Sequence, residues 1–551
     1  MTGAKIVIET LIEQGTEVVF GYPGGSVLNL YDELYLNSHR IKHILAAHEQ
    51  GAAHAGDGYA RTTGRVGVVI ATSGPGATNL VTGIANAYLD SVPMVFITGN
   101  VPTSLIGRDS FQEVDITGIT MPIVKHNFMV TDVTKLADTI REAFRIAKSG
   151  RPGPTLIDIP KDIQIAECNY EPAPVAEKKE IVRFTDDHIA RAAEMIAKAK
   201  RPYIYCGGGI VNSNAEDELL CLAKKIDAPV GTSMMGLSAI PSSQKYKLGM
   251  VGMHGIYTAT LAKAEADLVI AVGVRFSDRA TGDKKVYLKG ANIIHIDTDA
   301  AEIDKNITCH LGVIGDAKTV LSKLIPAVEE KKNEEWWKRI EQIKEYENEN
   351  KDPQNIGFTP YNIIDEVNSR SSSKMPIATD VGQHQMWVAQ RYRFESPRTF
   401  VTSGGLGTMG FGLGAAIGSA VGTGERTILF TGDGSFGMNL NEMATAVSQN
   451  LPLVVIVMNN GVLGMVRQWQ NMFYNQHYSE TTLQRKTDFV ALAKAFGADA
   501  YRATDMESFK DALDKAFATN GPVLIDCIID CDERVLPMIP AGKAVTDIII
   551  N

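Results

Sequence analysis

The segment TILFTGDGSFGMNLNEMATAVSQNLPLVVIVMNN, residues 427–460, carries the main fold signal of this chain. Residues 427–431 form a short apolar run that predicts a buried strand, and residues 451–458 form a second run rich in β-branched side chains. Residues 439–449, between the two runs, have the periodicity and composition of a helix. A strand, a helix and a strand of this length predict a right-handed crossover between two parallel strands.

Asp433 and Asn460 each follow one of these predicted strands. Open α/β sheets bind ligands just beyond the carboxyl ends of neighbouring strands. A carboxylate and an amide oxygen suit Mg²⁺, with diphosphate oxygens and water completing the octahedron, and Gly432 and Gly434 allow a diphosphate to approach the backbone closely. Alone, an Asp-Gly turn or an Asn-Asn loop would be an ordinary connection; together, at this spacing, they favour a metal–diphosphate site.

The size of the chain predicts several domains. A chain of 551 residues with 44% hydrophobic content is too large for one core and suggests about three. Residues 167–183 are polar and contain proline, and residues 329–357 are highly charged, so both read as linkers. Within the second, residues 334–349 predict a surface helix whose Trp336 and Trp337 pack on the body. We therefore expect three α/β domains with parallel sheets, at 1–165, 184–328 and 358–551.

Charge and composition argue against several classes of partner. The chain has 54 basic and 64 acidic residues, a net charge of −10, and no basic stripe, so we expect no nucleic-acid partner. No apolar run reaches the roughly eighteen residues that span a membrane. Residues 1–15 predict an amphipathic helix rather than a signal or transit peptide. The six cysteines form no CxxC pair, which favours free thiols and a cytoplasmic location.

The metal–diphosphate pattern resembles that of thiamine diphosphate enzymes. In that family a backbone carbonyl, here that of Val462, completes the protein ligands of the metal. Glu49, in HEQGAAHAGDGYAR at 48–61, would by itself be an ordinary carboxylate in the first turn of a helix. It matches the family's glutamate, which hydrogen-bonds the pyrimidine ring of the cofactor and drives loss of the thiazolium proton. Because Glu49 and Asp433 lie in different predicted domains, which in the family come from two subunits, the resemblance implies at least a homodimer.

The resemblance narrows, over essentially the full chain, to the catalytic subunits of acetohydroxyacid synthase, also called acetolactate synthase. It implies that pyruvate is decarboxylated on thiamine diphosphate and that the hydroxyethyl enamine condenses with a second 2-ketoacid, pyruvate or 2-ketobutyrate. The products would be 2-acetolactate or 2-aceto-2-hydroxybutyrate, precursors of valine, leucine and isoleucine. A homodimer or dimer of dimers and a small regulatory subunit are also implied. The segments that carry the resemblance are GYPGGSVLNLYDELY, HEQGAAHAGDGYAR, RDSFQEVDITGITMPIVKHNF, GVRFSDRATG, VGQHQMW, SGGLGTMGFGLGAA, GDGSFGMNLNEM and NNGVLGMVRQWQ.

Site residues follow from this resemblance by position. Some match residues that contact the diphosphate or hold the cofactor bent: Gln383, His384, Gly407, Met409 and Ser435. Others match residues near the reacting carbons or in the substrate channel: Gly25, Phe111, Gln112, Lys125, Met465 and Trp469. Trp469 is associated in the family with preference for 2-ketobutyrate, although core packing is its simpler interpretation. Arg279 matches an arginine that meets the carboxylate of the second ketoacid.

The middle section gives an ambiguous nucleotide signal. Asp297 closes an apolar strand and suits a ribose hydroxyl, but the glycines at 207–209 do not satisfy GxGxxG because Asn212 stands at the third position. A middle domain that binds nothing is therefore an alternative. The resemblance favours FAD with a structural, non-redox role. It places the FAD contacts at Arg151, His254, Gly273, Arg275, Asp297 and Asp316.

The chain departs from the common family pattern at Ser26, Gly56, Ser277 and Gly414, none of which removes a group that the chemistry needs. Three other functions stay open. A pyruvate oxidase would use thiamine and FAD to oxidise pyruvate, and a flavoprotein oxidoreductase would share only the fold. An inactive binding paralogue is disfavoured because Glu49, Asp433 and Asn460 are all present.

Overall fold

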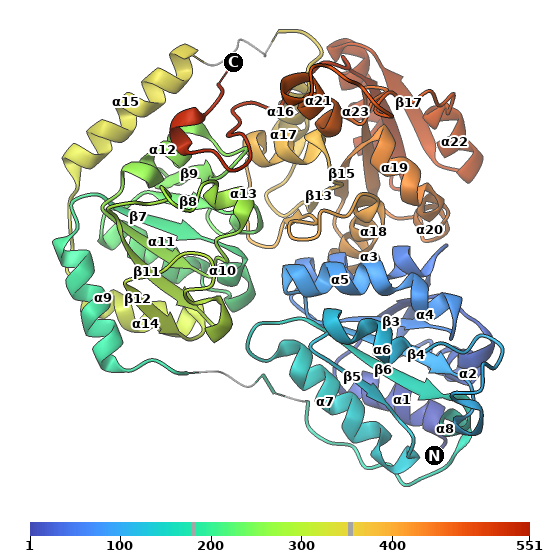
Figure 1. Cartoon of the computed structure of the whole chain (residues 1–551). Coiled ribbons are helices and arrows are strands. Elements are labelled where there is room, and N and C mark those ends of the chain that lie inside the picture. The colour runs from blue at the N-terminus through green and yellow to red at the C-terminus, as the bar shows by residue number, and fades with distance from the viewer. Residues whose placement is uncertain (176, 179–181, 351–355, 551) are drawn as a thin grey trace.

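The structure, a computed structural model, describes residues 1–175, 177–178, 182–350 and 356–550. Three six-stranded sheets, each entirely parallel, follow one another along the chain and are covered by helices (Figure 1). The prediction of three parallel α/β layers is confirmed. Parts of both predicted linkers, at 176, 179–181 and 351–355, lie outside the described residues.

The N-terminal sheet has the strand order β2-β1-β3-β4-β6-β5. Its direction of winding reverses between β1 and β3, so the loops after these strands open a crevice where α/β sheets bind ligands. The strands are β1 (Val18–Gly21), β2 (Lys42–Leu45), β3 (Gly67–Ala71), β4 (Met94–Asn100), β5 (His126–Met129) and β6 (Pro154–Pro160). The helices are α1 (Gly3–Glu13), α2 (Leu28–Leu36), α3 (Glu49–Thr63), α4 (Pro75–Asn79), α5 (Val81–Asp90), α6 (Ile116–Thr120), α7 (Leu136–Lys148) and α8 (Lys161–Ile165).

The middle sheet has the order β12-β11-β10-β7-β8-β9, which is the strand order of dinucleotide-binding sheets, with its reversal between β7 and β10. The strands are β7 (Pro202–Cys206), β8 (Val230–Thr232), β9 (Lys247–Met250), β10 (Leu268–Val272), β11 (Asn292–Asp297) and β12 (Leu311–Ile314). The helices are α9 (Asp186–Lys198), α10 (Gly208–Ser213), α11 (Glu216–Lys225), α12 (Tyr257–Glu265), α13 (Asp278–Thr281), α14 (Ala317–Ala327) and α15 (Glu334–Asn350).

The C-terminal sheet has the order β14-β13-β15-β16-β18-β17, which repeats the connectivity of the N-terminal sheet strand for strand. Its reversal lies between β13 and β15. The strands are β13 (Ile377–Thr379), β14 (Phe400–Val401), β15 (Thr427–Gly432), β16 (Leu453–Asn459), β17 (Asp499–Ala503) and β18 (Val523–Ile528). The helices are α16 (Pro360–Arg370), α17 (Gln383–Arg391), α18 (Phe411–Thr423), α19 (Asp433–Asn439), α20 (Met443–Ser448), α21 (Gly464–Phe473), α22 (Phe489–Phe496) and α23 (Met506–Ala518).

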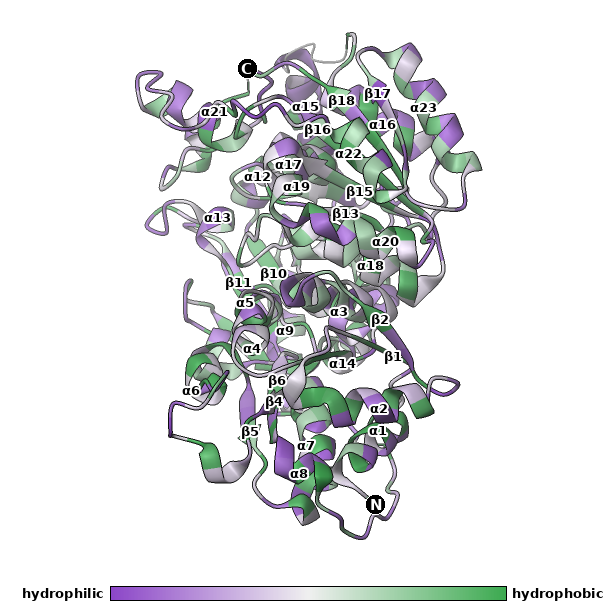
Figure 2. Ribbon diagram, turned by 90° about the vertical axis from the view of Figure 1, so that its right-hand side faces the viewer, coloured by the Kyte–Doolittle hydropathy of each residue, from purple (hydrophilic) through white to green (hydrophobic). Residues whose placement is uncertain are grey.

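The segment at 427–460 forms the predicted crossover, but its helix differs from the prediction. Strands β15 and β16 pair in parallel and are almost completely buried, and Figure 2 shows this sheet mainly in the hydrophobic colour. The helix expected at 439–449 is a 3-10 turn at Leu440–Glu442 followed by α20, and an additional helix, α19, precedes it and begins at Asp433 itself. The sequence pattern missed α19 because its glycines have low helix propensity, which packing at this site overrides.

Helices α3 and α18 join the N-terminal and C-terminal domains through direct backbone contact. A Cβ atom on Gly58 would collide with the carbonyl of Ala415, and one on Gly418 would collide with the carbonyl of Ala55. Gly414, one of the departures noted above, lies in the same seam: its Cβ would stand 2.8 Å from the carbonyl oxygen of Gly51. Glycine at these positions is what lets the two helices approach this closely.

Other sequence expectations can be compared with the structure. Helix α15 packs on the middle domain, where the indole nitrogens of Trp336 and Trp337 donate to the carbonyls of Pro202 and Asp227 at 3.1 Å each, so the prediction for this helix is confirmed. All six cysteines are free thiols. Within the described part of the chain, no helix has the length and apolar character required to cross a membrane.

Candidate active site

The reversal point of the C-terminal sheet positions the predicted metal–diphosphate residues. Asp433 follows β15 and opens α19, while Gln383 and His384 open α17 after β13. They line one small cavity of about 60 Å³. The lining also includes Met409, Gly432, Gly434, Ser435, Asn460, Val462 and Met465, so most of the predicted C-terminal site residues meet here. Gly407 is not in this lining but adopts a positive φ of 70° in the loop that leads to Met409.

The amide of Asn460 has a fixed orientation. Its Nδ2 donates to Oε1 of Gln383 at 3.3 Å, and its Oδ1 accepts from the backbone N–H of Val462 at 3.2 Å. Gln383 is held in turn, because its Nε2 donates to Oε1 of Gln468 and to the carbonyl of Glu533. The side-chain oxygen of Asn460 is thereby held on the turn that carries the carbonyl of Val462.

The residues of this cavity fit a metal-bound diphosphate. Burial raises the pKa of Asp433 to about 6, and its remaining partners are backbone N–H groups rather than a cationic side chain. A divalent cation would therefore balance a buried carboxylate that has no cationic partner among the described residues. His384 is fully buried, burial lowers its pKa to about 3, and its Nε2 has no hydrogen-bond partner. A phosphate oxygen would satisfy this neutral imidazole.

Glu49 occupies the first turn of α3, as predicted, and is 9% exposed. Its Oε2 accepts from Nδ2 of Asn79 at 2.9 Å, and a Cβ on Gly76 would stand 3.1 Å from its Oε1. Glu49 thus lies beside the loop after β3, at the reversal point of the N-terminal sheet. Among the residues described, none from the N-terminal domain lines the cavity at Asp433.

Glu442 is a positioning residue that the sequence reasoning missed. Its buried carboxylate accepts from the backbone N–H groups of Ala47 and His48, at 3.2 and 3.0 Å, immediately before Glu49. Burial raises its pKa, and Gly51 leaves the space that its carboxylate fills. Glu442 follows α19, so the segment that begins with Asp433 also holds the start of α3. The motif GDGSFGMNLNEM contains Glu442, but nothing in its pattern reveals a partner in another domain.

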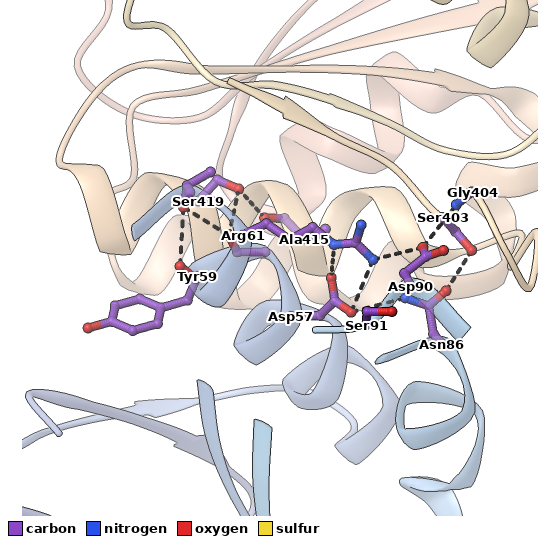
Figure 3. A network of polar contacts seen from close by, with 12 residues as sticks. Asp57, Tyr59, Arg61, Asn86, Asp90, Ser91, Ser403, Gly404, Ala415 and Ser419 are labelled. Atoms are coloured by element: carbon purple, nitrogen blue, oxygen red, sulfur yellow. Dashed lines mark hydrogen bonds and ion pairs between the residues drawn. The ribbon is translucent and has the colours of Figure 1, made fainter. Parts of the chain in front are cut away.

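A second missed feature is a buried polar network between the N-terminal domain and the 403–410 loop (Figure 3). The guanidinium of Arg61 bonds Asp57 at 2.5 Å and Asp90 at 2.9 Å, and both carboxylates are completely buried. Asp90 also accepts from the backbone N–H groups of Gly404 and Gly405 at 3.0 and 2.7 Å. The network therefore fixes the loop that carries Gly407 and Met409.

Its other branch runs through Asn86. The amide of Asn86 donates to Asp57 at 3.1 Å and accepts from the hydroxyl of Ser403 at 2.5 Å. Burial raises the pKa of Asp57, against the lowering effect of the adjacent Arg61 charge, and the two carboxylates raise the pKa of Arg61. Charged groups buried this deeply are tolerated because they pair with one another.

Arg279 and Trp469, both predicted to meet the substrate, lie next to each other, and this pair is called the proposed substrate wall below. The guanidinium carbon of Arg279, on α13, lies 6.0 Å from the ring centroid of Trp469 on α21. Trp469 packs against a small cluster of Met253, Leu536 and Met538, so it both contributes to packing and borders the arginine. Helices α21, α13 and α6 lie along one edge of the molecule, the left edge of Figure 2.

The predicted pocket residues of the N-terminal domain are Gly25, Phe111, Gln112 and Lys125, and none of them lines the described cavity at Asp433. A Cβ on Gly25 would meet no atom within 4 Å. Phe111 is 88% exposed, and Gln112 has a positive φ of 58°. Lys125 donates to the carbonyls of Ile146 and Ser149 at the end of α7, and burial lowers its pKa to about 8.

The middle sheet has its own cavity at the reversal between β7 and β10. It is about 160 Å³ in volume, and five of the six predicted FAD residues line it: Arg151, Gly273, Arg275, Asp297 and Asp316. Gly209 and Gly273 touch, with a Cβ on either standing 2.5 Å from the other's Cα. Burial raises the pKa of Asp297 to about 6. Glu302, unforeseen from the sequence, lines the cavity and bonds Arg151 at 2.8 Å.

This cavity can take a dinucleotide because the strand order of its sheet is that of dinucleotide-binding sheets, and Asp297 at the end of β11 offers a carboxylate to a hydroxyl group. His254 does not line it: its carbonyl accepts from Gln390 at 2.9 Å, and its buried Nε2 has no partner.

Three of the departures from the family pattern have local explanations. Ser26 holds two loops together, with its Oγ 2.9 Å from Oγ1 of Thr72 and accepting from the N–H of Ser73 at 2.9 Å. Gly56 faces Met94 and Val69, where a Cβ would stand 2.7 and 2.9 Å from their side chains. Ser277 precedes α13, and its carbonyl accepts from the N–H groups of Ala280 and Thr281, a role for which its side chain is not needed.

Comparison with known proteins gives one consistent result. Residues 1–119 match the N-terminal TPP binding domain of thiamine pyrophosphate enzymes, residues 189–324 the central domain, and residues 380–527 the C-terminal TPP binding domain. The chain is 45% identical to the probable acetolactate synthase large subunit of Methanocaldococcus jannaschii, over 100% of this chain and 95% of that protein. It is 44% identical to the acetolactate synthase large subunit of Corynebacterium glutamicum, with 100% and 90% covered, and to the isozyme 1 large subunit of Escherichia coli, with 100% and 97% covered.

The buried network predicts a large effect of Arg61→Met on stability. The substitution leaves Asp57 and Asp90 buried without their cation, so we expect the free energy of unfolding in urea to fall by about 3–5 kcal/mol. Arg65→Met is the matched control: Arg65 is half exposed and pairs with the exposed Glu17, so its loss should cost less than about 1 kcal/mol. Equal losses in the two variants would contradict the structural role of the network.

Proposed function

We infer that this chain, which belongs to the acetolactate synthase large subunits within the thiamine pyrophosphate enzymes, is an acetolactate synthase. It joins two molecules of pyruvate into 2-acetolactate with release of one carbon dioxide, or pyruvate and 2-ketobutyrate into 2-aceto-2-hydroxybutyrate. The observation that carries this proposal is the cavity at the C-terminal reversal point. There Asp433, Asn460 and the orphaned His384 together offer what a metal-bound diphosphate requires.

We propose three functional domains, at 1–165, 184–328 and 358–551. The residues proposed to hold the metal and the diphosphate all lie in the third domain, and Glu49 lies in the first. Asp433, Asn460 and the carbonyl of Val462 hold Mg²⁺. The diphosphate would be held by Gln383, His384, Gly432, Gly434 and Ser435, and Gly407 and Met409 would support the rest of the cofactor. Thiamine diphosphate supplies the electron sink for decarboxylation. Glu49 holds a proton at the pyrimidine ring nitrogen.

The substrate wall governs the second half of the reaction. Arg279 pairs with the carboxylate of the second ketoacid, since a guanidinium forms two parallel bonds to a carboxylate. Trp469 and Met465 supply an apolar surface that excludes water and stray proton donors. A wall of this kind can discriminate one methylene by about 1–3 kcal/mol, which would favour 2-ketobutyrate over pyruvate.

We assign the middle cavity to FAD in a structural role, held by Arg151, Gly273, Arg275, Asp297 and Asp316. The fit rests on the dinucleotide strand order and on the acid at the end of β11. His254 stays a proposed contact through its unpartnered Nε2.

The proposed assembly is a homodimer or a dimer of dimers. Glu49 and Asp433 of one chain do not share a cavity, and Gly25, Phe111, Gln112 and Lys125 lie on the same domain as Glu49. We propose that these N-terminal residues complete the site of a second copy. Because the relatives are named large subunits, we also infer a small regulatory partner.

One assay separates the proposed function from its rivals. Purified protein with pyruvate, Mg²⁺, thiamine diphosphate and FAD should make acetolactate without oxygen, detected by chromatography of the products. In a parallel reaction that contains oxygen and inorganic phosphate, acetyl phosphate together with peroxide would show a pyruvate oxidase instead. Reduction of the flavin by pyruvate without carbon–carbon bond formation would show an oxidoreductase, and a chain that binds the cofactors without any product would be an inactive paralogue.

Glu49→Gln tests the role of the acid. The amide keeps the shape of the side chain and its contact with Asn79, but it cannot share a proton with the pyrimidine ring. Hydrogen–deuterium exchange at C2 of bound thiamine diphosphate, followed by NMR, should slow by about 10²–10⁴-fold, while cofactor affinity stays close to that of the unchanged protein. An unchanged exchange rate would remove Glu49 from catalysis.

Complementation tests whether the site is shared between chains. Glu49→Gln and Asp433→Ala homodimers should both be inactive. A purified heterodimer of the two has one site with both substitutions and one with neither, so we expect roughly half of the unsubstituted activity. If Glu49 and Asp433 of one chain formed a site together, every site in the heterodimer would carry a substitution and it would be inactive.

A further inference from the structure

A cavity of about 310 Å³ lies between the middle domain and the C-terminal segment. Its walls come from α12, from α13 and the loop after it, and from residues 539–546. It is separate from the cavities at Asp433 and Asp297, although Met253 and Arg279 form one side of it. Its volume is in the range of small-molecule sites.

Lys263 lines this cavity and is only 3% exposed. Its ammonium nitrogen lies 5.0 Å from the ring centroid of Tyr205 and 4.7 Å from that of Tyr287. Its hydrogen bond to a protein acceptor, the carbonyl of Ala280, is long at 3.3 Å. No acidic side chain in the described structure pairs with it, and burial alone lowers its pKa to about 7.

Two other lysines of the chain, Lys247 and Lys331, use their ammonium groups to donate to three oxygen acceptors each. Lys247, which is partly buried, donates to the carbonyls of Leu237 and Ile240 and to the hydroxyl of Ser242, at 2.8–3.0 Å. Lys331 donates to three backbone carbonyls. An ammonium has three donors, and of those of Lys263 only one meets an oxygen, at 3.3 Å, while its other close contacts are the two tyrosine rings. A closer anionic acceptor can therefore still bind it.

Two residues that line the same cavity carry hydroxyl groups without a partner. The Tyr287 hydroxyl and Oγ1 of Thr260 are buried and have no hydrogen-bond partner. Buried polar groups are almost always paired, so these two hydroxyl groups, together with the long bond of Lys263, indicate a missing acceptor near these residues. A carboxylate offers two oxygens with several lone pairs and can accept from all three groups.

The other residues that line the cavity indicate the polarity and charge of the ligand beyond its carboxylate. Met253, Val286, Leu288, Ile539 and Val545 give the cavity an apolar surface, which favours a short aliphatic body. The lining contains four cations, Lys263, Arg279, Lys289 and Lys543, against two acids, Asp278 and Asp283. This balance favours an anion, and the single buried ammonium can balance one negative charge without leaving a second one buried.

We propose that the cavity at Lys263 binds a short aliphatic monocarboxylate, with Lys263, Thr260 and Tyr287 donating to its two oxygens. This site is additional to the thiamine and FAD cavities and does not depend on the proposed reaction. Its ligand neutralises the buried ammonium of Lys263 and fills the apolar space under the C-terminal segment.

A ligand in this cavity would affect the C-terminal segment that lies beside Arg279. The C-terminal segment is joined to the middle domain by two backbone bonds at the cavity, from Ile539 to Met253 at 2.8 Å and from Asp283 to Lys543 at 3.2 Å. Arg279 contacts the sulfur of Met253 at 3.8 Å. A ligand here contacts both sides of this seam, so it stabilises the position of the C-terminal segment beside Arg279.

Isothermal titration with isobutyrate tests the proposal. Isobutyrate has the carboxylate and the aliphatic body but no keto group, so it cannot turn over. Titrated into the full chain loaded with thiamine diphosphate, Mg²⁺ and FAD, it should bind. Lys263→Met keeps the length of the side chain and removes the charge, and we expect about tenfold to a hundredfold weaker binding. Tyr287→Phe, a milder change, should weaken binding by about twofold to tenfold.

Lys289→Met is the matched control, because Lys289 lines the same cavity but is exposed, and its loss should weaken binding less than about fivefold. Equal effects of the Lys263 and Lys289 substitutions would mean that only general positive charge attracts the anion, and would overturn the proposal. Affinity that none of the three substitutions changes would place the ligand in the thiamine site instead, and would overturn it as well. If Lys263→Met fails to fold, the comparison of Tyr287→Phe with Lys289→Met decides.

Discussion

The backbone contact between α3 and α18 is the constraint on which the catalytic arrangement depends. Glycines on both helices remove the side chains that would hold them apart, so the helix that begins with Glu49 is fixed against the C-terminal domain of its own chain. The same seam carries Glu442 under the start of α3 and the Arg61 network under the 403–410 loop. No described residue of the N-terminal domain lines the cavity at Asp433, which is why we assign Glu49 and Asp433 to a site shared by two copies.

The strand order of each sheet determines which kind of proposed site it carries. The N-terminal and C-terminal sheets reverse between their first and third strands, and each presents its proposed thiamine residues there. The middle sheet has the dinucleotide order, and the cavity beside its reversal point is lined by Asp297 of this sheet and by Arg151 of the N-terminal domain. Each cavity is therefore placed by connectivity, and side chains such as His384 then decide what each one fits.

Much of this was predictable from sequence, and the failures have physical causes. Strands such as β15 and β16 were predictable because a strand buried on both faces is a continuous apolar run. Asp433 and Asn460 were identified because they follow such runs directly. The start of α19 was missed because local helix propensity is poor there and packing overrides it. Glu442 and the Arg61–Asp90 pair were missed because their partners are distant in sequence, and no local pattern encodes a contact between domains.

The matching strand orders of the outer sheets also bear on the origin of the chain. Two six-stranded sheets with the same non-sequential order are what duplication of one ancestral module would leave behind. No sequence repeat survives between them, because connectivity is maintained by crossover handedness and burial while individual side chains are free to diverge. One descendant carries the proposed metal ligands and the other the proposed acid. A symmetric ancestor could have joined two such modules as separate chains, and their fusion would have preserved that pairing within a larger dimer.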